Sequence, residues 1–220
     1  MGTGALNAVD AFIRANTRLD RHPLVPEVSL YLASAITPIW TASEDSLATS
    51  GVEPPFWAFA WPGGAATARH ILDHPEGVRG RNVLDLAAGS GIAAIAAAMV
   101  GAASVFAADI DPTARAAIAL NAQSNGVEIV ISDGDPLTQE PPAEGLILAG
   151  DVCYARAMAE RVIDWLHAAR RAGAEVWLAD PGRAYLPTTG LSEMARIKVP
   201  TSLELEDRKM RETVLYRLAG

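Results

Sequence analysis

Three aspartates, each close to the end of a short apolar run, are the residues best suited to binding a charged ligand. Asp85 lies in V-L-D-L-A-A-G-S-G at 83–91, Asp109 lies 24 positions later in A-D-I-D-P, and Asp151 opens D-V-C-Y at 151–154. Apolar strands followed by loops bring such carboxylates to one edge of a parallel sheet. A carboxylate there can accept hydrogen bonds from ribose hydroxyls or from an amine.

The segment 83–91 predicts a buried strand that breaks into a glycine turn and opens a helix at 92–99. Gly89 and Gly91 have no Cβ, so the backbone can turn tightly and approach a ligand. A strand, a glycine loop and a helix N-terminus in this order form a nucleotide cradle. We expect the cofactor contacts to come from this loop and its neighbours, at Trp61, Gly63, Asp85, Ala87, Gly89, Gly91, Asp109, Ile110, Asp133 and Gly150.

Two ligand classes compete for the cradle. A dinucleotide would place its pyrophosphate on the loop, and the glycine fingerprint tolerates Ala94 at its third position. Asp85, however, would repel a pyrophosphate at 4–6 Å by about 1 kcal/mol or more. A sulfonium cation and an amino group are instead attracted by carboxylates. The order Asp85, Gly89-x-Gly91 and Asp109 therefore favours S-adenosylmethionine.

The elements that must position these residues alternate between strand and helix. Further strands are expected at 104–108, 127–131, 145–149 and 175–179, and helices at 112–124 and 156–171. This alternation predicts an α/β fold, a doubly wound, Rossmann-like and mostly parallel sheet of seven strands. The sheet should end in an antiparallel hairpin of strands at 203–206 and 214–218. That pattern puts Glu204 and Glu206 on a solvent-facing side.

Residues 1–53 are expected to form an N-terminal appendage to a domain at 54–220. The periodicity predicts a helix over 5–20 and a strand near 28–32. The appendage can be a cap on the substrate side or a packing extension. The aromatic stretch P-P-F-W-A-F-A-W-P-G-G at 54–64 can likewise be a core plug or a gate with Trp61 and Gly63 near the ligand, followed by a helix at 65–72.

Alternative interpretations stay open for three of the site residues. Asp133 can face the adenine or simply form a turn. Asp151 can accept hydrogen bonds from an amine or cap a helix. Tyr154 can line the acceptor channel or be an aromatic of the core or rim.

Composition narrows the class of protein. The net charge of −8 argues against a duplex nucleic acid partner. Cys153 is the only cysteine, so an internal disulfide is excluded, and the residue is expected to be small and buried. We find no metal-ligand spacing, no apolar run long enough for a membrane span and no secretory signal pattern. A cytoplasmic monomer is expected.

The motifs together resemble those of a known family. The segments at 83–91 and 108–112 look like motifs I and II of class I methyltransferases. With V-P-E-V-S-L at 25–30, W-P-G-G at 61–64, G-D-V-C-Y at 150–154 and D-P-G-R at 180–183, the set resembles the lysine methyltransferases of the electron transfer flavoprotein β subunit. The resemblance spans residues 25 to about 185.

The resemblance implies S-adenosylmethionine as cofactor and an electron transfer flavoprotein β subunit as protein substrate. It also implies a cofactor-loop acid at Asp85, a ribose acid at Asp109, a gate at Trp61 and a substrate-side pair at Asp151 and Tyr154. The predicted function is protein-lysine N-methylation. The alternatives are a ribosomal-protein or nicotinamide-like small-molecule N-methyltransferase, or a cofactor-binding module without catalysis.

Overall fold

A seven-stranded sheet forms the centre of the molecule. The computed structural model describes residues 3–33 and 55–219, and its sheet has the order β5-β4-β3-β6-β7-β9-β8. Five strands are parallel, and β9 runs antiparallel to both β7 and β8. The bounds are β3 Asn82–Leu86, β4 Ser104–Ala108, β5 Val130–Ser132, β6 Leu146–Gly150, β7 Glu175–Asp180, β8 Leu191–Pro200 and β9 Met210–Leu218. The predicted fold class is confirmed.

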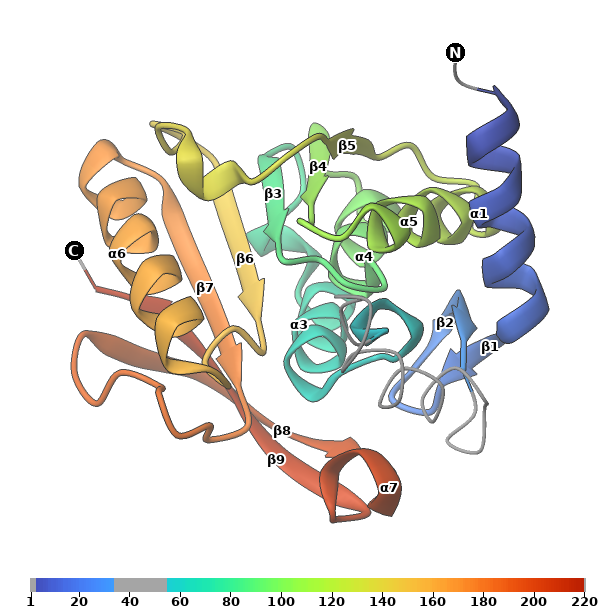
Figure 1. Cartoon of the computed structure of the whole chain (residues 1–220). Helices are drawn as coiled ribbons and strands as arrows, with labels where there is room; N and C mark the ends of the chain where they lie inside the picture. Colours follow the sequence, from blue (N-terminus) through green and yellow to red (C-terminus); the bar gives the residue numbers. More distant parts are fainter. Residues whose placement is uncertain (1–2, 34–54, 220) are drawn as a thin grey trace.

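Helices cover both faces of the sheet (Figure 1). On one face lie α3 Pro62–Asp73, α4 Ile92–Met99 and α5 Pro112–Ser124, and on the other lies α6 Arg156–Ala172. Short 3₁₀ turns occur at Phe56–Ala58, Pro75–Gly77 and Pro136–Thr138. The start of α5 follows from its sequence, because Asp111 accepts a 2.7 Å hydrogen bond from the Thr113 amide and proline occupies the next position.

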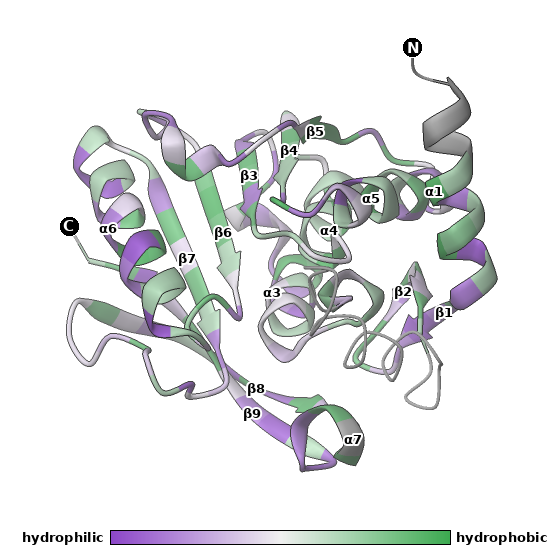
Figure 2. Cartoon of the chain, in the orientation of Figure 1, coloured by the Kyte–Doolittle hydropathy of each residue, from purple (hydrophilic) through white to green (hydrophobic). Residues whose placement is uncertain are grey.

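The core consists of apolar side chains on the two faces of the sheet. Strand β6 is buried over Leu146–Ala149, and Figure 2 shows it as a mainly hydrophobic ribbon beside a two-sided α6. Helix α6 buries Val162, Trp165 and Leu166. Such continuous burial is typical of a strand covered by helices on both sides. It fixes the carboxyl end of β6, where Asp151 follows.

The N-terminal segment differs from its prediction. Helix α1 covers Thr3–Asn16, and residues 18–22 form strand β1 (Arg18–His22) rather than the end of a helix. Strand β1 pairs antiparallel with β2 (Val25–Leu32), which includes the predicted strand. The amide of Tyr31 donates a 2.7 Å hydrogen bond to the Asn121 side chain on α5. The hairpin thus packs against the helices that cover one face of the sheet, and the boundary proposed at 53/54 lies outside the described residues.

The end of the chain corrects two further predictions. The L-E-L-E segment at 203–206 is a helical turn, α7 (Leu203–Glu206), and the strand that pairs with β9 is β8 at 191–200. The antiparallel hairpin exists, but with a different first strand. Glu206 is 3% exposed instead of solvent-facing. Alternation of leucine and glutamate does not distinguish a short strand from one helical turn whose acidic side chain is paired inside the protein.

Two smaller differences concern element boundaries. Helix α3 begins at Pro62, so Gly63 and Gly64 lie in its first turn and not in a preceding loop. Strand β5 is shorter than predicted and covers only Val130–Ser132. Within the described ranges, no helix combines the length and apolarity needed to cross a membrane.

Candidate active site at the carboxyl ends of β3 and β6

The strand order reverses between β3 and β6, which are hydrogen-bonded neighbours. Ligands of open α/β sheets bind at such a point, outside the carboxyl ends of the strands. The loop after each strand contains a non-glycine residue in the left-handed region, Ala87 with φ of 55° and Asp151 with φ of 56°. This conformation costs of order 1 kcal/mol or more and often marks functional loops. The two strained positions lie where the sequence predicts cofactor and acceptor.

The glycine loop has the predicted form. Gly91 has φ of 75° and caps α4, and a Cβ on it would lie 3.2 Å from Ile118. Asp85 is 4% exposed, and its carboxylate accepts a 3.0 Å hydrogen bond from the Ala94 amide in the first turn of α4. Burial raises the pKa of Asp85 to about 7. Asp85 therefore anchors the helix, and a cation near the loop would favour its ionised form.

Asp109 lies across the loop from Gly89. Its two carboxylate oxygens accept hydrogen bonds from the amides of Gly89 (2.9 Å) and Asp111 (3.0 Å). Burial raises its pKa above the ordinary value. A Cβ built on Gly89 would meet no described atom within 4 Å, so the loop faces open space. The Asp109 carboxylate, held beside the partly exposed backbone of Gly89, fits the adenosyl part of S-adenosylmethionine. Its lone pairs can accept hydrogen bonds from the ribose hydroxyls.

Ile110 and Asp133 lie at the rim of this region. Ile110 is 64% exposed. Asp133 follows β5, and its fully exposed side chain lies 3.8 Å from the Arg115 guanidinium in an ion pair. The structure thus places both residues on the carboxyl side of the sheet, next to the loops that follow β4 and β5.

Asp151 contacts the beginning of α3. Its Oδ2 accepts hydrogen bonds from the amides of Gly63 (2.6 Å) and Gly64 (3.3 Å). Burial raises the pKa of Asp151 to about 7. Among the described residues its Oδ1 has no hydrogen-bond partner. The residue therefore caps a helix, but α3 rather than the α6 that follows it, and its buried Oδ1 is left unpaired.

The glycines at 63 and 150 make this contact possible. A Cβ on Gly63 would lie 2.6 Å from the Ala179 carbonyl oxygen and 2.7 Å from the Asp151 amide nitrogen. A Cβ on Gly150 would lie 2.8 Å from the Gly64 nitrogen. Both glycines were expected to contact a cofactor. Their packing shows a further requirement, which is close approach between α3 and the end of β6.

Aromatic rings form a wall on the α3 side. Trp57 and Phe59 are buried in the core, as a plug would be. Trp61 donates a 2.8 Å hydrogen bond to the Phe56 carbonyl oxygen. The Phe56 ring lies 5.7 Å from the ring of Trp61 and 5.6 Å from that of Tyr154, which is 45% exposed. Phe56 thus connects the predicted gate to the predicted acceptor-side tyrosine.

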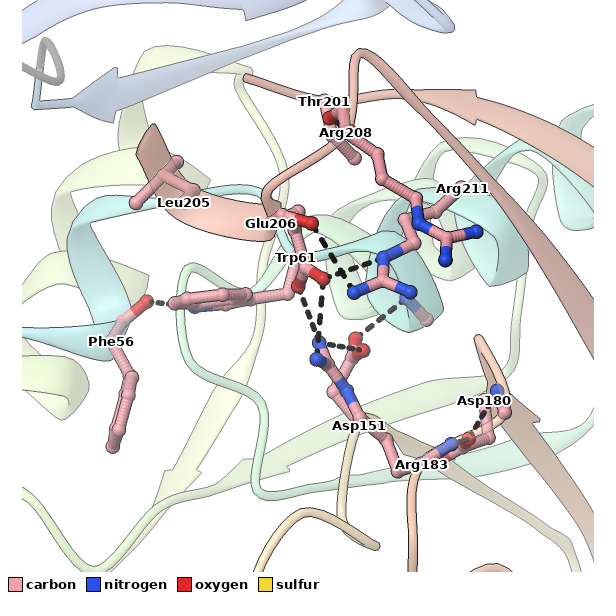
Figure 3. A network of polar contacts seen from close by, with 12 residues as sticks. Phe56, Trp61, Asp151, Asp180, Arg183, Thr201, Leu205, Glu206, Arg208 and Arg211 are labelled. Atoms are coloured by element: carbon pink, nitrogen blue, oxygen red, sulfur yellow. Dashed lines mark hydrogen bonds and ion pairs between the residues drawn. The ribbon is translucent and has the colours of Figure 1, made fainter. Parts of the chain in front are cut away.

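Charged residues from the C-terminal region complete the site. Asp180 and Arg183 belong to the D-P-G-R motif that the sequence indicated, whereas sequence patterns did not identify Glu206 and Arg211 as functional. Arg183 pairs with Asp151 and Glu206, and Arg211 also binds Glu206 (Figure 3). Asp180, in D-P-G-R, accepts hydrogen bonds from the amides of Gly182 (2.7 Å) and Arg183 (2.6 Å), so this motif orients Arg183. A pocket of about 220 Å³ adjoins the network and includes Trp61 and Glu206 in its lining.

Sequence comparison finds relatives along almost the whole chain. It is 34% identical to the electron transfer flavoprotein beta subunit lysine methyltransferase of Danio rerio, covering 98% of this chain and 85% of that protein. The proteins of the same name in Xenopus laevis and Homo sapiens are 39% and 37% identical, over 79% and 80% of this chain and 70% and 67% of theirs. The family model of ribosomal protein L11 methyltransferase (PrmA) matches residues 68–172.

Solved structures support the fold. The ribosomal protein L11 methylase of Lactobacillus delbrueckii subsp. bulgaricus superposes with a TM-score of 0.52 at 21% identity, covering 74% of this chain and 81% of that one. Magnesium protoporphyrin IX methyltransferase of Synechocystis PCC 6803 superposes with a TM-score of 0.52 at 14% identity, over 83% and 100%. With the nearly full-length sequence relatives, the glycine loop and the acid after β4, these findings establish that the chain belongs to the electron transfer flavoprotein beta subunit lysine methyltransferase family.

Proposed function

We propose that this protein transfers a methyl group from S-adenosylmethionine to a lysine side chain of an electron transfer flavoprotein β subunit. The observation that carries the proposal is the environment of Asp151. A buried carboxylate with one oxygen not hydrogen-bonded within the described structure follows the strand next to the glycine loop. The names of the relatives supply the substrate class.

In this proposal the glycine loop, with Ala87, Gly89 and Gly91, lies against the cofactor, and Asp85 lies beneath it. Asp109 accepts hydrogen bonds from the ribose hydroxyls. The remaining cofactor contacts are assigned to the rim and to the α3 side, at Ile110, Asp133, Trp61, Gly63 and Gly150. When bound, S-adenosylmethionine supplies a methyl group activated by the positive sulfonium.

Asp151 orients and deprotonates the acceptor amine. Methyl transfer needs a neutral amine whose lone pair points at the methyl carbon, and most of the rate can come from that alignment. Oδ2 is held by two amides of α3, so Oδ1 can accept a hydrogen bond from the lysine nitrogen. Burial raises the pKa of Asp151 to about 7, which brings the carboxylate closer to a lysine ammonium in basicity. Tyr154 and Phe56 border the path of the aliphatic lysine chain.

The proposal is tested by incubating the purified protein with tritiated S-adenosylmethionine and purified electron transfer flavoprotein β subunit, followed by mass spectrometry of the labelled peptide. The wild type should label lysine. Asp151→Asn should retain cofactor binding by calorimetry and lose methyl transfer, whereas Asp164→Asn, an exposed aspartate of α6, should behave like the wild type. Label on ribosomal protein L11 but not on the flavoprotein subunit would contradict the proposed substrate. It would favour a ribosomal-protein methyltransferase, the activity in the name of the matching PrmA family model.

A further inference from the structure

The buried carboxylate of Glu206 links the C-terminal hairpin to the candidate active site. Its side chain is 2% exposed, and both oxygens bind the Arg183 guanidinium, with one Nη1–Oε2 distance of 3.2 Å. Arg211 holds the same carboxylate through an Nε–Oε2 hydrogen bond of 2.9 Å. A carboxylate bound bidentately by arginine is held in a defined position and orientation. Glu206 therefore determines where the Arg183 head group lies.

Arg183 also faces Asp151, but more loosely. The Nη2 atom that binds Glu206 lies 3.6 Å from Oδ1 of Asp151 (Figure 3). This separation allows electrostatic attraction but is too long for a good hydrogen bond. Within the described structure Oδ1 accordingly has no hydrogen-bond partner, and neither has the Arg183 Nε. The guanidinium thus supplies charge to Asp151 while its hydrogen bonds go to Glu206.

We propose that Glu206 is a positioning residue that holds Arg183 back from Asp151 and so leaves the buried Oδ1 of Asp151 without a hydrogen-bond partner until the acceptor amine binds. The inference rests on the proposed function in one respect, namely that an amine binds Oδ1. The competition between two carboxylates for one arginine is independent of any substrate. If the charge of Glu206 is removed, Arg183 can close on Asp151 and occupy the oxygen that the amine needs.

The charges around Asp151 define the sign of the expected effect. The titratable or charged groups that face it are Arg183 and Asp180 at the end of β7, Glu206 of α7 and the Cys153 thiol of its own loop, while the amides at the start of α3 bind Oδ2. Arg183 lowers the pKa of Asp151, whereas Asp180 and Glu206 raise it. Glu206→Gln removes a negative charge and frees Arg183, so both effects stabilise the Asp151 carboxylate.

The direct experiment is a ¹³C NMR titration of the Asp151 carboxyl in the full-length protein, assigned by its loss in Asp151→Asn. In Glu206→Gln the midpoint should move to lower pH by about 1 pH unit. In Arg183→Gln it should move to higher pH, because the facing cation is gone. If the Glu206–Arg183 pair only stabilised the fold and had no electrostatic influence on Asp151, both variants would be less stable and both Asp151 midpoints would stay unchanged.

Glu175→Gln is the matched control. The Glu175 carboxylate also binds two arginines, Arg81 and Arg217, each at 2.9 Å, but it lies at the opposite end of β7 from Asp180. Its loss should not change the Asp151 midpoint. An unchanged midpoint in folded Glu206→Gln, or movement in the same direction in the two site variants, overturns the inference. If thermal unfolding shows that Glu206→Gln is not folded, the Arg183→Gln variant provides the test. An Asp151 midpoint that is unchanged or lowered in Arg183→Gln overturns the inference.

The titration needs neither cofactor nor acceptor, so its outcome is separate from that of the methylation assay. With the flavoprotein subunit as acceptor, Glu206→Gln should lower kcat by roughly ten- to a hundredfold. The acidic limb of its pH profile should move to lower pH, and the KM for S-adenosylmethionine should stay unchanged. A shifted titration without any methyl transfer by the wild type would contradict the proposed function and leave the Glu206–Arg183 coupling intact.

Discussion

The Asp151 carboxylate accepts a 2.6 Å hydrogen bond from the amide of Gly63, a residue 88 positions earlier in the chain. In the described structure the N-cap residue of α3, Trp61, makes no side-chain capping bond, so Asp151 supplies the missing acceptor for the first turn. The helix dipole favours a negative charge at that position. One contact therefore caps a helix and fixes the orientation of the proposed amine acceptor.

The first prediction concerns the space at this contact. Gly63→Ala would put a Cβ within 2.7 Å of the Ala179 carbonyl oxygen and the Asp151 amide nitrogen, so backbone must move. We expect a loss of roughly 1–3 kcal/mol in the free energy of unfolding and a large fall in kcat. Gly64→Ala is the control, because its Cβ would meet only the Ile92 side chain at 3.1 Å. Urea unfolding and turnover assays of both variants check the difference, and equal losses would contradict the close-approach argument.

The second prediction concerns pH and Asp85. The unfolded chain releases this proton near the ordinary value of 3.8, whereas burial raises the folded pKa to about 7. Between these values the folded state binds more protons, so the free energy of unfolding falls as pH rises from about 4 to 7, by at most about 1.4 kcal/mol per pH unit for this group.

Asp85→Asn should therefore flatten the pH dependence of stability in that window, measured by urea unfolding at pH 5, 6 and 7. Asp164→Asn, on the exposed side of α6, should leave the slope unchanged. Some slope should persist in Asp85→Asn, because burial also raises the pKa of Asp151 to about 7. A slope identical to that of the wild type would contradict the assignment.

The parallel half of the sheet could be predicted because its signals are local. Each strand is a short apolar run, and glycine turns and the Asp111-Pro112 cap mark the helix boundaries. The order of Asp85, Gly89 and Asp109 predicts a cofactor site at the carboxyl ends of the strands, and the structure places all three residues there. Burial of Asp85 qualifies the repulsion argument used to exclude a pyrophosphate, because a carboxyl with a pKa of about 7 is only partly ionised at neutral pH.

The C-terminal part could not be predicted for a physical reason. Strand β8 is an edge strand with most of its side chains partly exposed, so it has no strong apolar pattern. Glu206 is buried because two arginines neutralise it, Arg183 from 23 positions earlier and Arg211 from 5 positions later. The residue types of the L-E-L-E segment do not reveal these ion pairs. The left-handed conformations of Ala87 and Asp151 are equally invisible in residue type, because neither is glycine.

The third prediction tests the ribose acid. Asp109→Ala should weaken S-adenosylmethionine binding roughly ten- to a hundredfold, since each hydrogen bond to a charged group contributes about 1.5–3 kcal/mol. Asp111→Ala is the control, because it removes the cap of α5 at a cost of about 1 kcal/mol in stability without removing the ribose acceptor. Isothermal titration calorimetry measures both. Unchanged affinity in Asp109→Ala would exclude the ribose role.

The last prediction separates acceptor binding from cofactor binding at Tyr154. This ring is 45% exposed and lies against Phe56, three residues after Asp151. If it borders the lysine path, Tyr154→Ala should raise the KM for the protein acceptor by roughly tenfold, equivalent to about 1.4 kcal/mol of lost ring contact. The affinity for S-adenosylmethionine should not change, and Tyr154→Phe should stay close to the wild type because it keeps the ring. Tyr185→Ala is the matched control, since Tyr185 is 37% exposed nearby but its ring stacks on Arg156. A loss of cofactor affinity in Tyr154→Ala, or an equal rise of KM in Tyr185→Ala, would place Tyr154 outside the acceptor channel.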